Sequence, residues 1–158
     1  VYLCEDTEQV KDVSTANAIV LESNIDDMNP EHYDFILEQL FNAGASDAWL
    51  IPIVMKKSRP AVTLSILCKE ELVEKMKEIV FTHSTSIGIR ECSVKKNMLR
   101  REESAVETVF GSVRIKNSFF NGKLVRSKPE FGDCKKLAEK HKVSISEIEK
   151  AVNKIAEK

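Results

Sequence analysis

The alternation of hydrophobic and polar residues predicts six secondary-structure elements in the first hundred residues. Apolar side chains recur every three or four positions over residues 30–43 and 69–82, which is the spacing of an amphipathic helix. Short apolar stretches bounded by turn residues indicate four strands, at residues 17–25, 47–56, 61–68 and 87–99. The order β-α-β-β-α-β predicts a ferredoxin-like α+β unit, with two helices on one face of an antiparallel four-stranded sheet.

Three local signals refine these elements. Asn29 is a suitable N-cap for the first helix, with Pro30 at the first helical position. Gly44 is expected to end that helix as the residue after the C-cap. Pro52 has no backbone N–H, so the strand that contains it should lie at a sheet edge or carry a bulge.

A smaller β-meander with two helices follows. The strand patterns cover residues 104–110, 112–119 and 123–126. Asn121-Gly122 is a hairpin signal between the last two strands. Residues 129–141 indicate a helix, and Ser144 with Glu147 forms a capping box that opens the last helix.

These patterns divide the chain into three expected parts. Residues 1–16 are interpreted as a linker and the tail of a preceding domain, and residues 17–100 as the ferredoxin-like domain. Residues 101–158 are interpreted as the β-meander plus helical appendage.

Composition and charge argue against two classes of partner. The 24 Lys and Arg residues nearly balance the 25 Asp and Glu residues, so a global basic field for nucleic acid is absent. Aromatic residues make up 6%, and Trp49 alone stands out in the predicted core strands, which disfavours RNA binding through the sheet. The longest apolar runs are far shorter than the roughly 20 residues that cross a bilayer, so no membrane segment is expected.

The four cysteines are widely spaced and form no Cys-x-x-Cys pair, which disfavours a local structural zinc site. They are Cys4, Cys68, Cys92 and Cys134. We interpret them as reduced thiols of a cytoplasmic protein. Cys68 and Cys92 are expected in strands, and Cys134 is expected to be a buried thiol because no base lies near it in the sequence.

A carboxylate pair, Asp26 and Asp27, lies at the first strand-to-helix junction. Carboxylate oxygens are hard ligands that suit Mg²⁺ or Mn²⁺, the ions that commonly accompany a triphosphate. The alternative is that these residues only form the turn and cap the helix.

Two cationic or hydroxyl-rich loops could bind phosphate. The first is the predicted hairpin tip with Lys56, Lys57 and Arg59. The second joins the second helix to the fourth strand and offers Ser84, Thr85, Ser86, Gly88 and Arg90. The alternatives are a solvated loop for the first and a plain helix cap and turn for the second.

We expect the carboxylate junction to lie at the opposite end of the sheet from these two loops. One pocket in one subunit would then be difficult to build. Either the pocket is shared between subunits or the Asp pair is structural. Both side-chain rows of residues 47–56 are apolar, which predicts that both are buried and favours a homo-oligomer. The competing explanation is that the appended elements of the same chain cover the second row.

Five longer strings occur together in one order and spacing. They are ESNIDDMNPE at 22–31, AGASDAWLIPIVMKKSRP at 43–60, THSTSIGIR at 82–90, VFGSVRIK at 109–116 and KPEFGDCKKLAEKHKVS at 128–144. Together they resemble the C-terminal domain of the nickel insertion protein family, the nickel-pincer cofactor cyclometallases, over residues 17–150. Residues 1–5 resemble the final strand of that family's N-terminal domain.

The resemblance implies a CTP-dependent nickel chelatase or cyclometallase, a lyase. Such an enzyme inserts nickel into pyridinium-3,5-bisthiocarboxylic acid mononucleotide to make the nickel-pincer cofactor. In that family the C-terminal domain binds CTP with Mn²⁺ or Mg²⁺, and the His-rich nickel-binding segment belongs to the N-terminal domain. The resemblance therefore implies a CTP-binding part that is inactive without its N-terminal partner region and receives nickel, the substrate ion, mainly through it.

One other class remains open from the residues alone. The ferredoxin-like fold also serves as a small-molecule-binding regulatory module without catalysis, and residue types do not separate the two.

Overall fold

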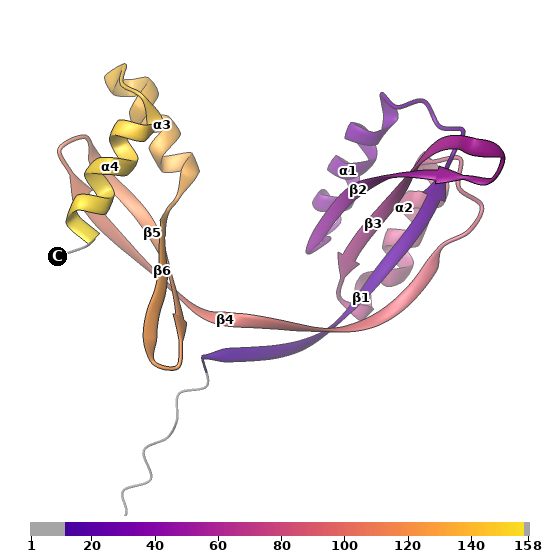
Figure 1. Ribbon diagram of the computed structural model, residues 1–158, viewed down its shortest axis with the longest axis horizontal. Coiled ribbons are helices and arrows are strands. Elements are labelled where there is room, and N and C mark those ends of the chain that lie inside the picture. Colours follow the sequence, from indigo (N-terminus) through magenta and orange to yellow (C-terminus); the bar gives the residue numbers. More distant parts are fainter. Residues whose placement is uncertain (1–11, 157–158) are drawn as a thin grey trace, which may run out of the picture. The chain divides into compact units, whose positions relative to one another are not determined.

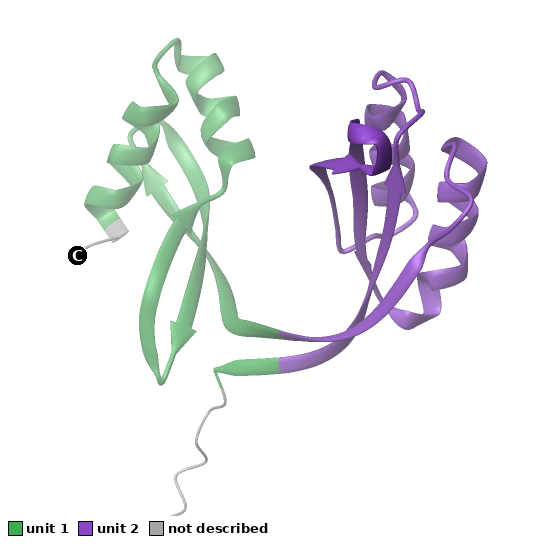
Figure 2. Ribbon diagram, turned by 45° about the vertical axis from the view of Figure 1, so that its right-hand side comes forward, with its two compact units in different colours: residues 1–14, 97–158 green, residues 15–96 purple. Residues whose placement is uncertain are grey.

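The computed structural model describes residues 12–156 and divides them into two compact units (Figures 1 and 2). Unit 2 comprises residues 15–96, and unit 1 comprises the residues up to Ser14 together with those from Asn97 onward. The strand predicted at residues 1–5 and Cys4 lie outside the described residues. Among the helices of the described part, none is long and apolar enough to cross a membrane.

Between residues 12 and 156 the structure contains six strands and four α-helices. The strands are β1 (Val13–Ile25), β2 (Asp47–Met55), β3 (Arg59–Cys68), β4 (Arg90–Thr108), β5 (Gly111–Phe120) and β6 (Lys123–Pro129). The α-helices are α1 (His32–Asn42), α2 (Val73–His83), α3 (Phe131–His141) and α4 (Ile145–Ala156). Short 3-10 turns cover Lys56–Ser58 and Glu70–Leu72.

Unit 2 confirms the predicted ferredoxin-like α+β arrangement. Its elements run β-α-β-β-α-β, and its strands follow the order β2-β3-β1-β4 (Figure 1). The helices α1 and α2 pack on the sheet through fully buried side chains. These are Leu21, Ile36, Leu40, Leu64, Ile66 and Met76. Burial of each such side chain contributes roughly 1.5–3 kcal/mol.

The ends of α1 agree with the sequence at one terminus only. Gly44 follows the C-cap with a φ of +99°, its N–H bonds to the Phe41 carbonyl and the Ala45 N–H bonds to the Leu40 carbonyl, which is a Schellman motif. At the other end α1 begins at His32 and not at Pro30, although Asn29 Oδ1 accepts the Glu31 N–H at 3.1 Å, the kind of bond expected of an N-cap. Residues 29–32 close a preceding turn, so the regular helical bonds start later.

Strand β2 lies at the sheet edge, as Pro52 predicts. Within the described chain only one of its two side-chain rows packs against the core, so burial of the second row by a partner subunit stays a prediction. Ala48 and Leu50 pack against the core, whereas Trp49 is 37% and Ile51 41% exposed. The reason is geometric: successive strand residues point to opposite faces, and α1 and α2 cover only one of them.

The strand β4 runs from unit 2 into unit 1 without a break, so the two strands predicted at 87–99 and 104–110 are one element. Residues 100–103, between the two predicted strands, are all charged. In the structure these residues pair with β5, from Arg100 opposite Phe119 to Glu103 opposite Lys116, and backbone pairing continues the strand through them.

Unit 1 contains the β-meander and two helices that the sequence predicts. Its core consists of Val113, Ile115, Cys134, Ala138, Ile148 and Val152. Asn121 and Gly122 both have positive φ, as a two-residue hairpin turn requires. The capping box is confirmed, because the Glu147 N–H donates to Ser144 Oγ (3.2 Å) and the Ser144 N–H donates to Glu147 Oε2 (2.9 Å).

Candidate functional site

Three connections of unit 2 meet at one end of its sheet: the β1–α1 junction, the β2–β3 hairpin and the α2–β4 loop. The prediction that the carboxylate junction lies at the opposite end is wrong. Strands β1 and β3 are antiparallel with Ile25 opposite Val62, so β1 ends beside the start of β3. Strand β3 then leads away, and α2 returns along the sheet, which brings the α2–β4 loop to the same end (Figure 1).

The two candidate carboxylates join these connections. Asp26 Oδ2 accepts a hydrogen bond from Arg59 Nη1 of the hairpin at 3.1 Å. Asp27 Oδ1 accepts one from Thr85 Oγ1 of the α2–β4 loop. The negative charge of Asp27 and, more strongly, burial raise the pKa of the Tyr33 phenol at the start of α1.

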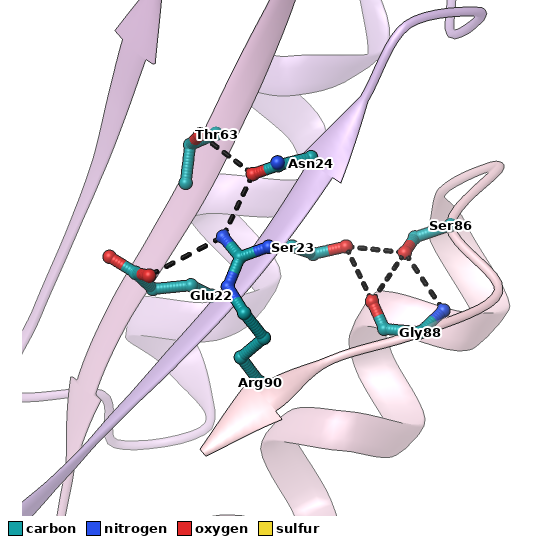
Figure 3. A network of polar contacts seen from close by, with 7 residues as sticks. All are labelled: Glu22, Ser23, Asn24, Thr63, Ser86, Gly88 and Arg90. Atoms are coloured by element: carbon teal, nitrogen blue, oxygen red, sulfur yellow. Dashed lines mark hydrogen bonds and ion pairs between the residues drawn. The ribbon is translucent and has the colours of Figure 1, made fainter. Parts of the chain in front are cut away.

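Arg90 is held by two side chains of β1, one of which also bonds to a side chain of β3. Its Nη2 donates to Asn24 Oδ1 at 2.9 Å and lies 3.4 Å from Glu22 Oε2 (Figure 3). Asn24 Oδ1 also accepts from Thr63 Oγ1 at 2.8 Å. The Arg90 side chain is still 58% exposed, so the guanidinium is positioned but remains accessible.

The serines of the α2–β4 loop are used by the loop itself. The hydroxyls of Ser23 and Ser86 bond to each other and lie 3.1 and 2.9 Å from the Gly88 carbonyl oxygen (Figure 3). Ser84 Oγ donates to the Val80 carbonyl at 2.6 Å and accepts from the Ser86 N–H at 3.1 Å. These contacts shape the loop, and together with the Thr85–Asp27 bond they engage all three hydroxyls that we assigned to phosphate.

Packing within the chain does not require a glycine at position 88. A Cβ at this position would meet no atom within 4 Å, and its φ lies outside the left-handed region. The space next to its backbone is therefore open to a ligand.

The lysines of the hairpin tip are available for binding. Lys57 and Ser58 adopt positive φ values of 60° and 55°, which turn the chain sharply before Arg59. Within the part of the chain that the structure describes, the ammonium groups of Lys56 and Lys57 have no ion-pair partner.

Two cavities at this end of unit 2 are lined in part by the α2–β4 loop. The Arg90 cavity has a volume of about 390 Å³. It is lined by Asn24, Met55, Ser86, Ile87, Gly88, Ile89 and Arg90. The Phe35 cavity has a volume of about 450 Å³ and is lined by residues of α1, of α2 and of the loop up to Thr85.

The carboxylates at this end of unit 2 suit a divalent ion that is bound by phosphate oxygens as well as by protein. Between residues 12 and 156, no three His, Cys, Asp or Glu side chains form a group that could hold a metal ion by themselves. Mg²⁺ is usually bound by one or two carboxylates together with substrate phosphates, and Mn²⁺ accepts the same oxygen ligands. Asp26 and Asp27 match that smaller requirement, since each uses one oxygen in the contacts above.

Sequence analysis missed the roles of Asn24 and Thr63 in holding Arg90. The alternation along β1 could have shown that Glu22 and Asn24 share the sheet face opposite Leu21. Nothing in the sequence indicates that Thr63 lies opposite Asn24, because this depends on the register of β1 and β3. Cys134 is buried and Cys68 lies in a strand, β3, as predicted. Cys68 is buried as well, and burial raises the pKa of both thiols.

Comparison with known proteins identifies relatives over nearly the whole chain. A sequence model of the family described as "Nickel insertion protein" matches residues 1–149. The pyridinium-3,5-bisthiocarboxylic acid mononucleotide nickel insertion protein of Clostridium acetobutylicum is 45% identical over 154 residues, 98% of this chain and 36% of the relative. The protein of that name from Thermotoga petrophila is 41% identical over 140 residues, 88% of this chain and 35% of the relative. The chain thus spans about a third of the length of these relatives.

Solved structures agree with this result. The apo C-terminal domain of a cyclometallase involved in the synthesis of the NPN cofactor of lactate racemase superposes with a TM-score of 0.87. It is 26% identical, and the match covers 92% of this chain and all of that one. A protein from Methanopyrus kandleri shares the fold with a TM-score of 0.66 at 19% identity, over 87% of this chain and 85% of that one. The chain therefore belongs to the nickel insertion protein family and represents its C-terminal domain.

Proposed function

We propose that unit 2 binds CTP together with Mn²⁺ or Mg²⁺. The chain would be the CTP-binding part of a cytoplasmic enzyme, a lyase of the cyclometallase type, that inserts nickel into pyridinium-3,5-bisthiocarboxylic acid mononucleotide. The observation that carries the proposal is the convergence of cations and carboxylates from three connections at one end of one sheet. Relatives named for nickel insertion into this mononucleotide support the choice of reaction.

The cations would bind the triphosphate. Arg90 lines a cavity beside the open backbone of Gly88, and Lys56 and Lys57 extend from the neighbouring hairpin. Arg59 is paired with Asp26 through one contact while its side chain is 52% exposed. Exposed pairs of this kind contribute only about 0–1 kcal/mol, so a phosphate can replace the carboxylate at small cost.

Asp26 and Asp27 would hold the divalent ion against the phosphates. Release of Asp26 from Arg59 would make its carboxylate available for the ion as the phosphate takes the guanidinium. Nickel is the substrate of the proposed reaction, and the N-terminal region of the full-length protein would supply it. The relatives are about three times as long as this chain, which leaves room for such a region.

The experiment that tests nucleotide binding is a thermal-shift comparison of CTP, ATP and GTP, each with Mn²⁺ or Mg²⁺. Ligand at 100 times its Kd stabilises the folded state by about 2.7 kcal/mol. For a unit of this size each kcal/mol raises the Tm by roughly 4–8 °C. We expect the largest shift with CTP and metal, and loss of most of it with EDTA. No shift, or equal shifts with all three nucleotides at millimolar concentration, would contradict the proposal.

We also propose that the chain forms a homo-oligomer through the open face of β2. Trp49 and Ile51 expose 37% and 41% of their surface there, next to the buried hydroxyl of Ser65, which has no hydrogen-bond partner among the described residues. Partner subunits commonly cover such apolar patches. Light scattering at micromolar concentration should give a mass above that of the 17.9 kDa monomer. A clean monomer with and without CTP and metal would exclude a stable oligomer.

A further inference from the structure

The Phe35 cavity has a different chemical character from the Arg90 cavity. It lies between the first turns of α1 and the last turn of α2, and its walls include Met28, Glu31, His32, Phe35, Thr82 and His83. Its volume of about 450 Å³ is within the usual range of small-molecule sites. The walls thus combine an aromatic ring and a thioether with imidazole, hydroxyl and carboxylate groups.

An aromatic surface is presented to solvent in this cavity. The Phe35 side chain is 50% exposed, although it lies on a helix whose other face forms the core. The His83 ring packs edge-on against it, with centroids 5.2 Å apart and an interplanar angle of 85°. His83 therefore helps to fix the orientation of the Phe35 ring, and the buried Met28 adds an apolar surface next to it.

Polar groups without partners surround this ring. Among the residues that the structure describes, the side chains of Glu31, His32 and Thr82 form no hydrogen bond or ion pair. They offer one negative charge, an imidazole and a hydroxyl. These are groups that would recognise a flat ring carrying both positive and negative charge.

The two cavities share one loop. Thr85 lines the Phe35 cavity, and the next residue, Ser86, lines the Arg90 cavity. Asp27 bonds to Thr85 at this boundary. Ligands in the two cavities would therefore contact adjacent residues of the same short segment.

We propose that the Phe35 cavity binds the pyridinium ring of the pyridinium mononucleotide substrate. This inference rests on the proposed function, in which the Arg90 cavity holds the triphosphate. A pyridinium ring is a cation, which is attracted to the face of an aromatic ring and to a carboxylate such as Glu31. Its thiocarboxylate substituents would accept hydrogen bonds from His32 and Thr82.

The experiment uses nicotinic acid mononucleotide, a pyridinium mononucleotide with one carboxylate, as the probe. Calorimetry would measure its binding and that of CTP with Mn²⁺ to the whole chain and to three variants. These are Phe35→Ala, Arg90→Ala and the control Phe81→Ala, whose side chain is 49% exposed on α2 and does not line the cavity. Phe35 is half exposed, so its truncation should leave the fold intact, and circular dichroism checks this.

We expect Phe35→Ala to weaken probe binding about tenfold and to leave CTP binding within about twofold of the unmodified chain. Arg90→Ala should show the reverse, and Phe81→Ala should change neither. His32→Gln, a second variant in the cavity, should weaken the probe alone. If Arg90→Ala keeps CTP binding while Phe35→Ala loses probe binding, the proposed triphosphate site at Arg90 is contradicted. The assignment of the pyridinium ring to the Phe35 cavity would still stand.

Three results would overturn the inference. The first is the absence of probe binding to the unmodified chain at millimolar concentration. The second is probe binding that Phe35→Ala and His32→Gln leave unchanged. The third is an equal loss of CTP binding in Phe35→Ala, which would show that the cavity holds part of CTP instead.

Discussion

Unit 1 and unit 2 each place two helices on antiparallel strands, but they use their charged side chains differently. In unit 1, Arg114 bonds to both carboxylate oxygens of Asp133 at 2.8 and 3.0 Å and joins β5 to α3. At the loop end of unit 2, Arg59 makes a single contact of 3.1 Å with Asp26. Arg90 likewise lies 3.4 Å from its only carboxylate partner among the described residues, Glu22.

Acidic side chains of unit 1 also form hydrogen bonds and ion pairs that stabilise the fold. The Arg114 guanidinium lowers the pKa of Asp133 from 3.8 to about 2, assisted by the backbone N–H of Arg114. Asp12, which is 4% exposed, accepts a hydrogen bond from Arg100 and another from the Gly122 N–H of the hairpin turn. These bonds lower its pKa as well. Charges in unit 1 hold elements together, whereas those at the loop end of unit 2 are weakly paired and can be transferred to a ligand.

The largest effect is expected from a core truncation that affects one unit only. Ile148 is fully buried in unit 1, so Ile148→Ala should destabilise that unit by about 2–5 kcal/mol. Trp49, the single tryptophan, reports on unit 2. Urea unfolding should therefore show an earlier transition by circular dichroism than by tryptophan fluorescence. An equal shift of both signals would show that the units do not unfold separately.

Loss of a cation in unit 2 should affect binding rather than folding. Arg90→Ala and Lys56→Ala should each weaken CTP binding by about 1.5–3 kcal/mol, because each removes a charge-assisted hydrogen bond. The matched control is Arg101→Ala, an exposed arginine of unit 1. Calorimetry measures the affinities, and unfolding midpoints should stay unchanged. Unaltered affinity in both unit 2 variants would show that the phosphates bind elsewhere.

A smaller effect is expected at the start of α4. Ser144→Ala removes the hydroxyl that accepts the Glu147 N–H and should cost about 0.5–2 kcal/mol of helix stability in unit 1. Ser144→Asp, which restores a capping oxygen, should recover most of the loss. Chemical denaturation followed by circular dichroism would measure both. A variant as stable as the unmodified chain would indicate that the backbone of this turn is held by other contacts.

The smallest effect is expected from Asp133→Asn, and it should depend on pH. The folded pKa of Asp133 is about 2, below its ordinary value of 3.8, so the ionised carboxylate stabilises the fold fully above about pH 4. That stabilisation is lost as the pH falls from 3.8 towards 2. The stability difference between the two proteins should therefore shrink over this range. A difference that stays constant from pH 6 to pH 2 would contradict the assigned ion pair.

The sequence alone determined the type and order of the elements, apart from the division of β4 into two strands, because local patterns specify them. Helical periodicity, the Asn121-Gly122 turn and the Ser144–Glu147 capping box involve residues at most a few positions apart, and the structure confirms them. The resemblance to the nickel insertion protein family was equally available from the sequence, since it rests on the order of distinctive strings.

Only the tertiary structure decided which of the candidate residues meet. The register of β1 and β3 places Asp26 beside Arg59 and Asn24 beside Thr63, although 33 and 39 residues separate them in the chain. From the sequence we had expected Asp26 and Arg59 at opposite ends of the sheet. Strand direction and register depend on backbone pairing between distant segments. Hydrophobic periodicity is a local pattern, so it does not predict that pairing.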